Sequence, residues 1–278
     1  MIPLASEIAL SPEFTQQAAL HKELRDEFAT LLVDRDTLVH TVKTNIETDY
    51  QLKIGGKQYA LFMRRIESLR LKRKLEILQA AVNRGEMLED CNIEDQLDKE
   101  FAEWQRQAND LLARIEQAEF NANLPLHTAE GTAELKKLYR ALAKKIHPDL
   151  NPGQSIDHAN LWLRVVDAYS KGNLQELRIL TLMAEDFRDE SPSMNTLEKL
   201  KQNCQRLRDG IMALINQLAQ IKAQFPFPIA EQLKDEAWVL EQNREMDGMI
   251  IEWQKSIKQY QQAIEELTTR SLQPQIIH

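Results

Sequence analysis

The chain has 278 residues, and its 43% hydrophobic and 28% charged residues are typical of a folded protein rather than a disordered one. Its formal net charge of −8 argues against a basic nucleic-acid-binding domain. Glycine is scarce, with eight residues, and aromatic residues make up only 6%, whereas good helix formers such as Leu, Glu, Gln and Ala are plentiful. The composition therefore favours an all-α fold.

The two cysteines and the apolar runs indicate the cellular compartment. Cys91 and Cys204 lie far apart without metal-ligand spacing, which argues against a disulfide framework and a structural zinc site. No apolar run approaches the roughly 18 residues of a membrane span. The first residues also lack the basic and apolar segments of a secretory signal. We expect a cytoplasmic protein with no membrane partner, no metal and no cofactor.

Three stretches of helical periodicity occupy the N-terminal region, residues 1–125. The second stretch runs from about Lys57 to Asn83, and the third places its apolar residues on one stripe from Ile93 to Ala118. Gly55-Gly56 separates the first two stretches and predicts a turn between them. Each long helix needs a partner to cover its stripe, so we predict an antiparallel coiled-coil hairpin. The first stretch carries Leu24, Phe28, Leu31, Leu38 and Val42.

The C-terminal region, residues 191–278, carries two heptad patterns separated by Phe225-Pro226-Phe227-Pro228. A short proline-rich connection between two such helices predicts a folded-back coiled-coil hairpin. Homodimerisation through the same stripes is the alternative. The first pattern comprises Leu197, Leu200, Cys204, Leu207, Ile211, Leu214, Leu218 and Ile221, and the second comprises Ile250, Trp253, Ile257, Tyr260, Ile264 and Leu267.

The middle region, residues 126–190, begins with an amphipathic helix that ends near Ile146. Five basic and two acidic residues give the segment 132–149 a formal charge of +3, opposite in sign to the whole chain. The apolar face of the helix comprises Leu135, Leu138, Leu142 and Ile146, and its basic face comprises Lys136, Lys137, Arg140 and Lys144.

A second helix follows this basic helix after a loop. Pro148 ends the first helix, because the residue before a proline is driven out of the α region. Ser155 is a candidate N-cap for the second helix, and Gly172 is a candidate C-cap. We predict an antiparallel hairpin with His147-Pro148-Asp149 in its connecting loop, followed by a further helix over residues 173–187.

These residues resemble the J domain of the DnaJ family over about residues 132–171. The resemblance rests on Leu-Lys-Lys-x-Tyr-Arg-x-Leu-Ala-x-Lys before the His-Pro-Asp triplet, Asn-Pro-Gly after it, and Ala168-Tyr169 in the next helix. It implies a co-chaperone, not an enzyme, that docks on a DnaK-type chaperone ATPase and stimulates ATP hydrolysis. The helical arms would then recruit an unknown client.

The resemblance also implies roles for individual residues. Asp149 would accept hydrogen bonds from an arginine of the partner, Pro148 would set the shape of the loop, and His147 would pack around it. Tyr139 would contact the partner beside the basic stripe. Long-range attraction to the acidic partner surface would come from Lys136, Lys137, Arg140 and Lys144.

The sequence departs from the family pattern where the first J-domain helix is expected. Nothing before residue 132 resembles that helix, and we predict that the end of the third N-terminal stretch, around Leu111, Leu112 and Ile115, replaces it. Leu150 and Ala141 stand where basic residues are common in the family. The chain also lacks the Gly/Phe-rich linker and the cysteine-rich region of complete DnaJ proteins, so any client binding would fall to the helical arms.

Three other functions compete with the co-chaperone. The first is a coiled-coil adaptor whose J-like segment does not stimulate any ATPase. The second is a catalytic or metal site at His147 and Asp149, which the sequence disfavours because no third ligand stands at suitable spacing. The third is nucleic-acid binding by a basic cluster that Glu67 and Glu76 dilute and that comprises Arg64, Arg65, Arg70, Lys72, Arg73 and Lys74.

Overall fold

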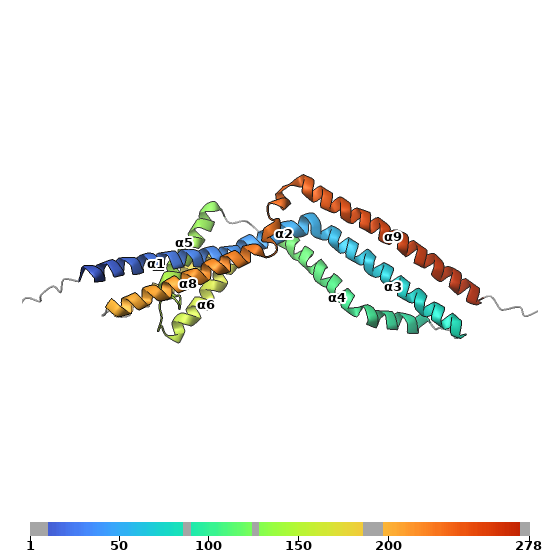
Figure 1. Cartoon of the computed structure of the whole chain (residues 1–278), viewed down its shortest axis with the longest axis horizontal. Coiled ribbons are helices and arrows are strands. Elements are labelled where there is room, and N and C mark those ends of the chain that lie inside the picture. Colours follow the sequence, from blue (N-terminus) through green and yellow to red (C-terminus); the bar gives the residue numbers. More distant parts are fainter. Residues whose placement is uncertain (1–10, 86–89, 124–127, 186–196, 273–278) are drawn as a thin grey trace, which may run out of the picture. The chain divides into compact units, whose positions relative to one another are not determined.

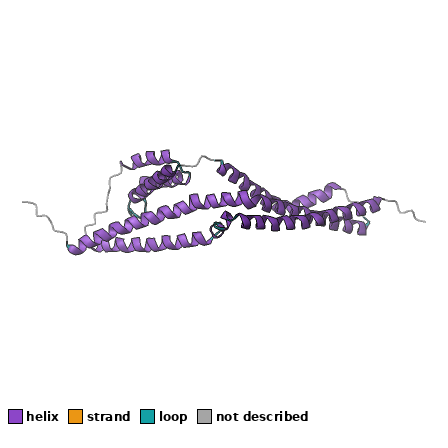
Figure 2. Ribbon diagram, turned by 90° about the horizontal axis from the view of Figure 1, so that it is seen from above, coloured by secondary structure: helices purple, strands orange, loops and turns teal. Residues whose placement is uncertain are grey.

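The computed structural model describes residues 11–85, 90–123, 128–185 and 197–272, and within these ranges it contains helices and no strands (Figures 1 and 2). This confirms the all-α prediction. None of the described helices is long and apolar enough to cross a membrane. The α-helices are α1 (Pro12–Thr37), α2 (Lys43–Tyr50), α3 (Gly56–Arg84), α4 (Asp90–Ala122), α5 (Ala129–Ile146), α6 (Ile156–Ser170), α7 (Leu174–Glu185), α8 (Leu197–Ala223) and α9 (Glu236–Leu272).

The predicted turn at Gly55-Gly56 was wrong, because the backbone stays helical from Pro12 to Arg84. Two π-helical turns, η1 (Leu38–Val42) and η2 (Gln51–Gly55), link α1, α2 and α3. Both glycines are right-handed helical, with φ of −54° at Gly55 and −58° at Gly56. Glycine costs a helix only about 1 kcal/mol relative to alanine, so packing overrides it. The helix ends instead at Gly85, which adopts the left-handed conformation with φ +69° and caps the C-terminus of α3.

The chain folds into two compact units, and each unit combines an N-terminal with a C-terminal segment. Unit 1 contains residues 1–45 and 125–228, and unit 2 contains residues 46–124 and 229–278. These boundaries differ from the predicted regions 1–125, 126–190 and 191–278. The predicted regions followed the order of the sequence, whereas helices pack wherever an apolar stripe finds a complementary partner.

Unit 1 is built on α1 and α8, which lie side by side and run in the same direction (Figure 1). Near their beginnings, Lys201 of α8 pairs with Glu13 of α1 at 2.6 Å. Helices α5, α6 and α7 pack on one another, and α5 also packs on α1. The shared core includes Leu24, Phe28, Leu32, Leu135, Tyr139, Leu142, Ile146, Trp162, Val165, Leu177, Leu180, Leu207 and Ile211.

Unit 2 is a layer of three helices in which α3 lies between α4 and α9 (Figure 1). Arg70 of α3 pairs with Glu94 of α4 at 2.5 Å, and Lys57 of α3 pairs with Asp247 of α9 at 2.5 Å. The hairpin of the N-terminal region is therefore α3–α4, and not the first stretch against the second. The fully or nearly buried apolar residues include Ile54, Ile66, Ile93, Leu97, Leu233 and Ile257.

The predicted C-terminal hairpin of α8 against α9 was also wrong. Helix α8 packs on α1 in unit 1, and α9 packs on α3 in unit 2. A heptad stripe requires an apolar partner but does not specify which helix supplies it. The predicted dimerisation stripe on α8 is already covered within one chain, since its buried residues are Leu200, Cys204, Leu207, Ile211 and Leu214.

The basic cluster of α3 is largely neutralised inside unit 2. Arg73 is bonded to Glu100 of α4 at 2.8 Å, and Lys74 to Glu94 of α4 at 2.8 Å. Arg64 pairs with Glu67 on its own helix at 2.7 Å. Nucleic-acid affinity depends on basic groups that can replace the counterions of phosphates. Cations already paired with carboxylates are poorly suited to that role.

Candidate functional site: the His-Pro-Asp loop and the basic face of α5

Local signals place the loop between α5 and α6 where the sequence predicts it. The hydroxyl of Thr128 caps α5 by accepting a hydrogen bond from the backbone N–H of Gly131 at 3.0 Å. Helix α5 ends at Ile146, and His147 is extended with φ −67° and ψ 131°, as expected before a proline. Gly172, at φ +64°, separates α6 from α7. We call residues 147–155 the His-Pro-Asp loop.

The triplet divides into one buried and two exposed residues. His147 is 9% exposed, whereas Pro148 and Asp149 face solvent. The backbone N–H of Asp149 donates to Nδ1 of His147 at 3.0 Å. The carbonyl of His147 accepts from the backbone N–H groups of Leu150 and Asn151 at 3.1 and 2.9 Å. His147 is therefore the internal support of the loop, and Pro148 and Asp149 are its outward surface.

The imidazole of His147 lies between two aromatic rings. Its centroid is 4.9 Å from the ring of Trp162 and 5.6 Å from the ring of Phe28, both with edge-on geometry. Burial lowers the pKa of His147, although the nearby Asp149 opposes that shift. Because Nδ1 accepts a hydrogen bond, the ring is neutral and carries its proton on Nε2.

Acidification should therefore destabilise unit 1. Burial also lowers the pKa of His21 on α1, and the charges of Arg25 and Arg206 add to the shift. A histidine whose pKa is lowered on folding stabilises the protein fully above about pH 6.5, and this contribution is lost as the pH falls through the folded pKa. Each histidine contributes a slope of at most about 1.4 kcal/mol per pH unit.

We expect the melting temperature of unit 1 to decrease when the pH is lowered from 7.5 to 5.5. His21→Gln removes one of the two groups, so the variant should show a shallower fall over the same interval. Thermal unfolding followed by amide exchange in α5 and α8 measures both curves. Equal slopes for the wild type and the variant would contradict a contribution from His21.

Tyr139 is not the surface contact that the family resemblance implies. Its side chain is 0% exposed, and its hydroxyl donates to Oδ2 of the buried Asp36 at 2.5 Å. Its ring stacks on Tyr169 with centroids 4.0 Å apart. Burial raises the pKa of Tyr139, and the charge of Asp36 adds to the shift. The apolar face of α5 includes this ring because position 139 lies one turn from both Leu135 and Leu142.

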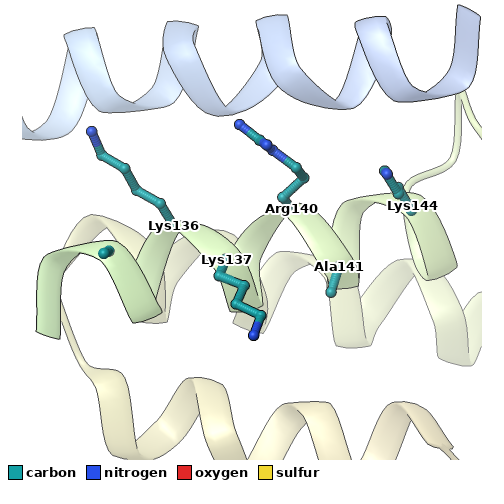
Figure 3. A pocket seen from close by; sticks show the side chains of 6 residues that line it. Lys136, Lys137, Arg140, Ala141 and Lys144 are labelled. Carbon is teal, nitrogen blue, oxygen red and sulfur yellow. The ribbon is translucent and has the colours of Figure 1, made fainter. Parts of the chain in front are cut away.

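Four cations line the opposite face of α5 around a hollow of about 420 Å³. Figure 3 shows Lys136, Arg140 and Lys144 extending toward α1, and Lys137 pointing to the other side. Lys144 pairs with Asp26 of α1 at 2.6 Å. The other three side chains are exposed, and no described carboxylate forms an ion pair with them. The hollow therefore presents the positive charge of Lys136, Lys137 and Arg140.

Helix α1, and not the end of α4, packs against the α5–α6 hairpin. The prediction that Leu111, Leu112 and Ile115 replace the first J-domain helix was wrong, because α1 is the helix that packs on α5. Phe28 of α1 lies against the ring of His147, and Arg25 of α1 donates hydrogen bonds to the loop. Arg25 could not be identified from the sequence, because its hydrogen-bonding partners lie 119 to 126 residues away.

No three His, Cys, Asp or Glu side chains within the described ranges converge in a way that would hold a metal ion. Comparison with known proteins does not assign this site: no protein-family model, curated protein or solved structure matches the chain.

Proposed function

We propose that this protein is a J-domain-type co-chaperone that docks on a DnaK-type chaperone and accelerates its ATP hydrolysis. The observation that carries the proposal is the exposed Pro148-Asp149 tip, supported from inside by His147 and bordered by Lys136, Lys137 and Arg140. This combination of a shaped loop and an adjoining basic face is what the resemblance to the DnaJ family requires.

The two parts of the surface have different physical roles in the proposal. The cations of α5 attract an acidic surface over several ångströms and raise the association rate, an effect that salt screens. Asp149 acts after contact, because its exposed carboxylate accepts charge-assisted hydrogen bonds from an arginine of the partner. The protein itself performs no covalent step. It shifts the partner toward its hydrolysing state by binding that state more tightly.

The central test is the substitution Asp149→Asn in the full-length protein. It removes one charge from a solvent-facing position, so the fold should be unchanged. Loss of a charged hydrogen bond costs about 1.5–3 kcal/mol, so the co-chaperone concentration for half-maximal stimulation should rise about tenfold or more. Single-turnover ATP hydrolysis by a purified DnaK-type chaperone measures this effect.

Asp95→Asn is the matched control, because Asp95 is an exposed aspartate on α4 in unit 2. This variant should stimulate ATP hydrolysis like the wild type. Equal stimulation by both variants would reject the proposed role of the loop. Complexes that form with a DnaK-type chaperone without any stimulation by the wild type would favour the coiled-coil adaptor.

A further inference from the structure

We propose that Arg25 of α1 is the positioning residue that holds the His-Pro-Asp loop in its docking shape. The loop-holding role stands on the structure of unit 1 alone, and its consequence for ATP hydrolysis rests on the proposed function. Helix α1 is separated from the loop by more than 100 residues of sequence. Its contribution would make the site a composite of two distant segments of the chain.

The guanidinium of Arg25 binds residues on both sides of the His-Pro-Asp triplet. Nη2 donates to the carbonyl of Lys144 in the last turn of α5 at 2.7 Å and to Oδ1 of Asn151 at 2.9 Å. Nη1 donates to the carbonyl of Leu150 at 2.9 Å. One planar guanidinium therefore joins a residue before the triplet to the two residues that follow it.

The loop has a physical need for this donor. The carbonyls in the last turn of a helix lack partners within the helix and carry partial negative charge. At the end of α5, Arg25 supplies donors and a positive charge at that point. The amide of Asn151 also donates to the carbonyls of Lys144 and His147, at 3.0 and 3.2 Å, so Arg25 orients a side chain that itself bridges the loop.

Neighbouring residues of α1 fix the position of Arg25. Asp26 pairs with Lys144 in the last turn of α5, and Phe28 lies against His147 in the loop, so two further contacts reach this region from one turn of α1. On the other side, α1 packs along α8. The guanidinium is thus presented by a helix that is held on two faces, which is how a positioning group keeps a constant geometry.

The experiment compares Arg25→Met, Arg25→Lys and the control Lys22→Met, which changes an exposed residue of the same helix. In Arg25→Met, amide exchange at Leu150 and Asn151 should accelerate about tenfold or more, because three hydrogen bonds to charge are lost. Amide exchange in α7 should not change. Arg25→Lys should be intermediate, since an ammonium cannot reproduce the planar fork of donors.

The same variants are then compared in ATP hydrolysis with a DnaK-type chaperone. The loop of Arg25→Met must be ordered when the partner binds, which weakens binding. The concentration of this variant at half-maximal stimulation should therefore rise about tenfold, and the maximal rate should be unchanged. A loss of fold would instead lower the maximal rate and accelerate exchange throughout unit 1.

The two readouts separate the two proposals. Unchanged exchange at Leu150 and Asn151 in Arg25→Met would overturn the positioning role, whatever the partner does. Accelerated exchange together with unchanged half-saturation would overturn its consequence for docking. Accelerated exchange in the variant with no stimulation by the wild type would support the loop-holding role of Arg25 and reject the co-chaperone function.

Discussion

Phe28→Ala should be among the most destabilising single substitutions in unit 1. The ring is 3% exposed and lies in the core where α1, the loop and α8 meet. It contacts the imidazole of His147 on one side, and its ring edge lies beside Gly210 of α8 on the other. Removing a buried phenyl ring forfeits its transfer free energy and leaves a cavity, which costs about 3–5 kcal/mol.

Phe120→Ala is the matched control, because that ring on α4 is 61% exposed. The free energy of unfolding of the Phe120→Ala variant should differ from that of the wild type by no more than about 0.5 kcal/mol. Hydrogen exchange in increasing urea measures both effects, with α5 reporting on unit 1 and α3 on unit 2. Phe28→Ala should shift the exchange of α5 and leave α3 close to the wild type. A loss below about 1 kcal/mol would contradict the central place of Phe28.

The substitutions Gly210→Ala and Gly248→Ala should have opposite effects on stability, although both glycines lie inside helices. A Cβ at Gly210 would stand 2.7 Å from Cε2 of Phe28 and 3.3 Å from its Cδ2. Such an overlap in a packed core costs about 1–3 kcal/mol, which exceeds the gain of about 0.5–1 kcal/mol from replacing a helical glycine. We expect Gly210→Ala to destabilise unit 1 by about 1–2 kcal/mol.

Gly248→Ala should instead stabilise α9. Apart from its chain neighbours and the backbone of its own helix, no atom lies within 4 Å of a Cβ at that position, so only the helical preference of alanine remains. The expected gain is about 0.5–1 kcal/mol. Urea unfolding curves for the two variants, resolved by unit through hydrogen exchange, give the comparison directly. Stabilisation of unit 1 by Gly210→Ala would show that α8 does not need this close approach to Phe28.

These contacts explain why the helices could be predicted and their pairing could not. The periodicity in α8 and α9 identified both helices and the apolar face of each. The short proline-rich segment at 225–228 suggested that the two helices fold back on one another. The length of a connection, however, does not determine which helices pack together. The apolar stripes of α1 and α3, which cover α8 and α9, lie about 190 residues earlier in the chain, so the sequence of α8 and α9 does not reveal them.

The candidate site divides in the same way. Helical spacing identified the basic face with Lys136, Lys137 and Arg140, and the structure places all three at the surface. The helical spacing did not reveal that Tyr139 is buried, since a tyrosine at the border of an apolar face can point into the core or toward solvent. The ring faces inward because its hydroxyl donates a hydrogen bond to the carboxylate of Asp36 on α1. That carboxylate is 103 residues distant in sequence.

The sequence alone determined the all-α class, the end of α5 before Pro148, the break at Gly172 and the charge of the α5 face, because each depends on residues within one or two helical turns. Tertiary structure decided that α1 completes the site, that α8 and α9 pair with different N-terminal helices, and that Gly55-Gly56 remains helical. The hydrophobic effect is nondirectional. An apolar stripe on a helix therefore favours packing against another apolar surface, but it does not determine which helix provides that surface.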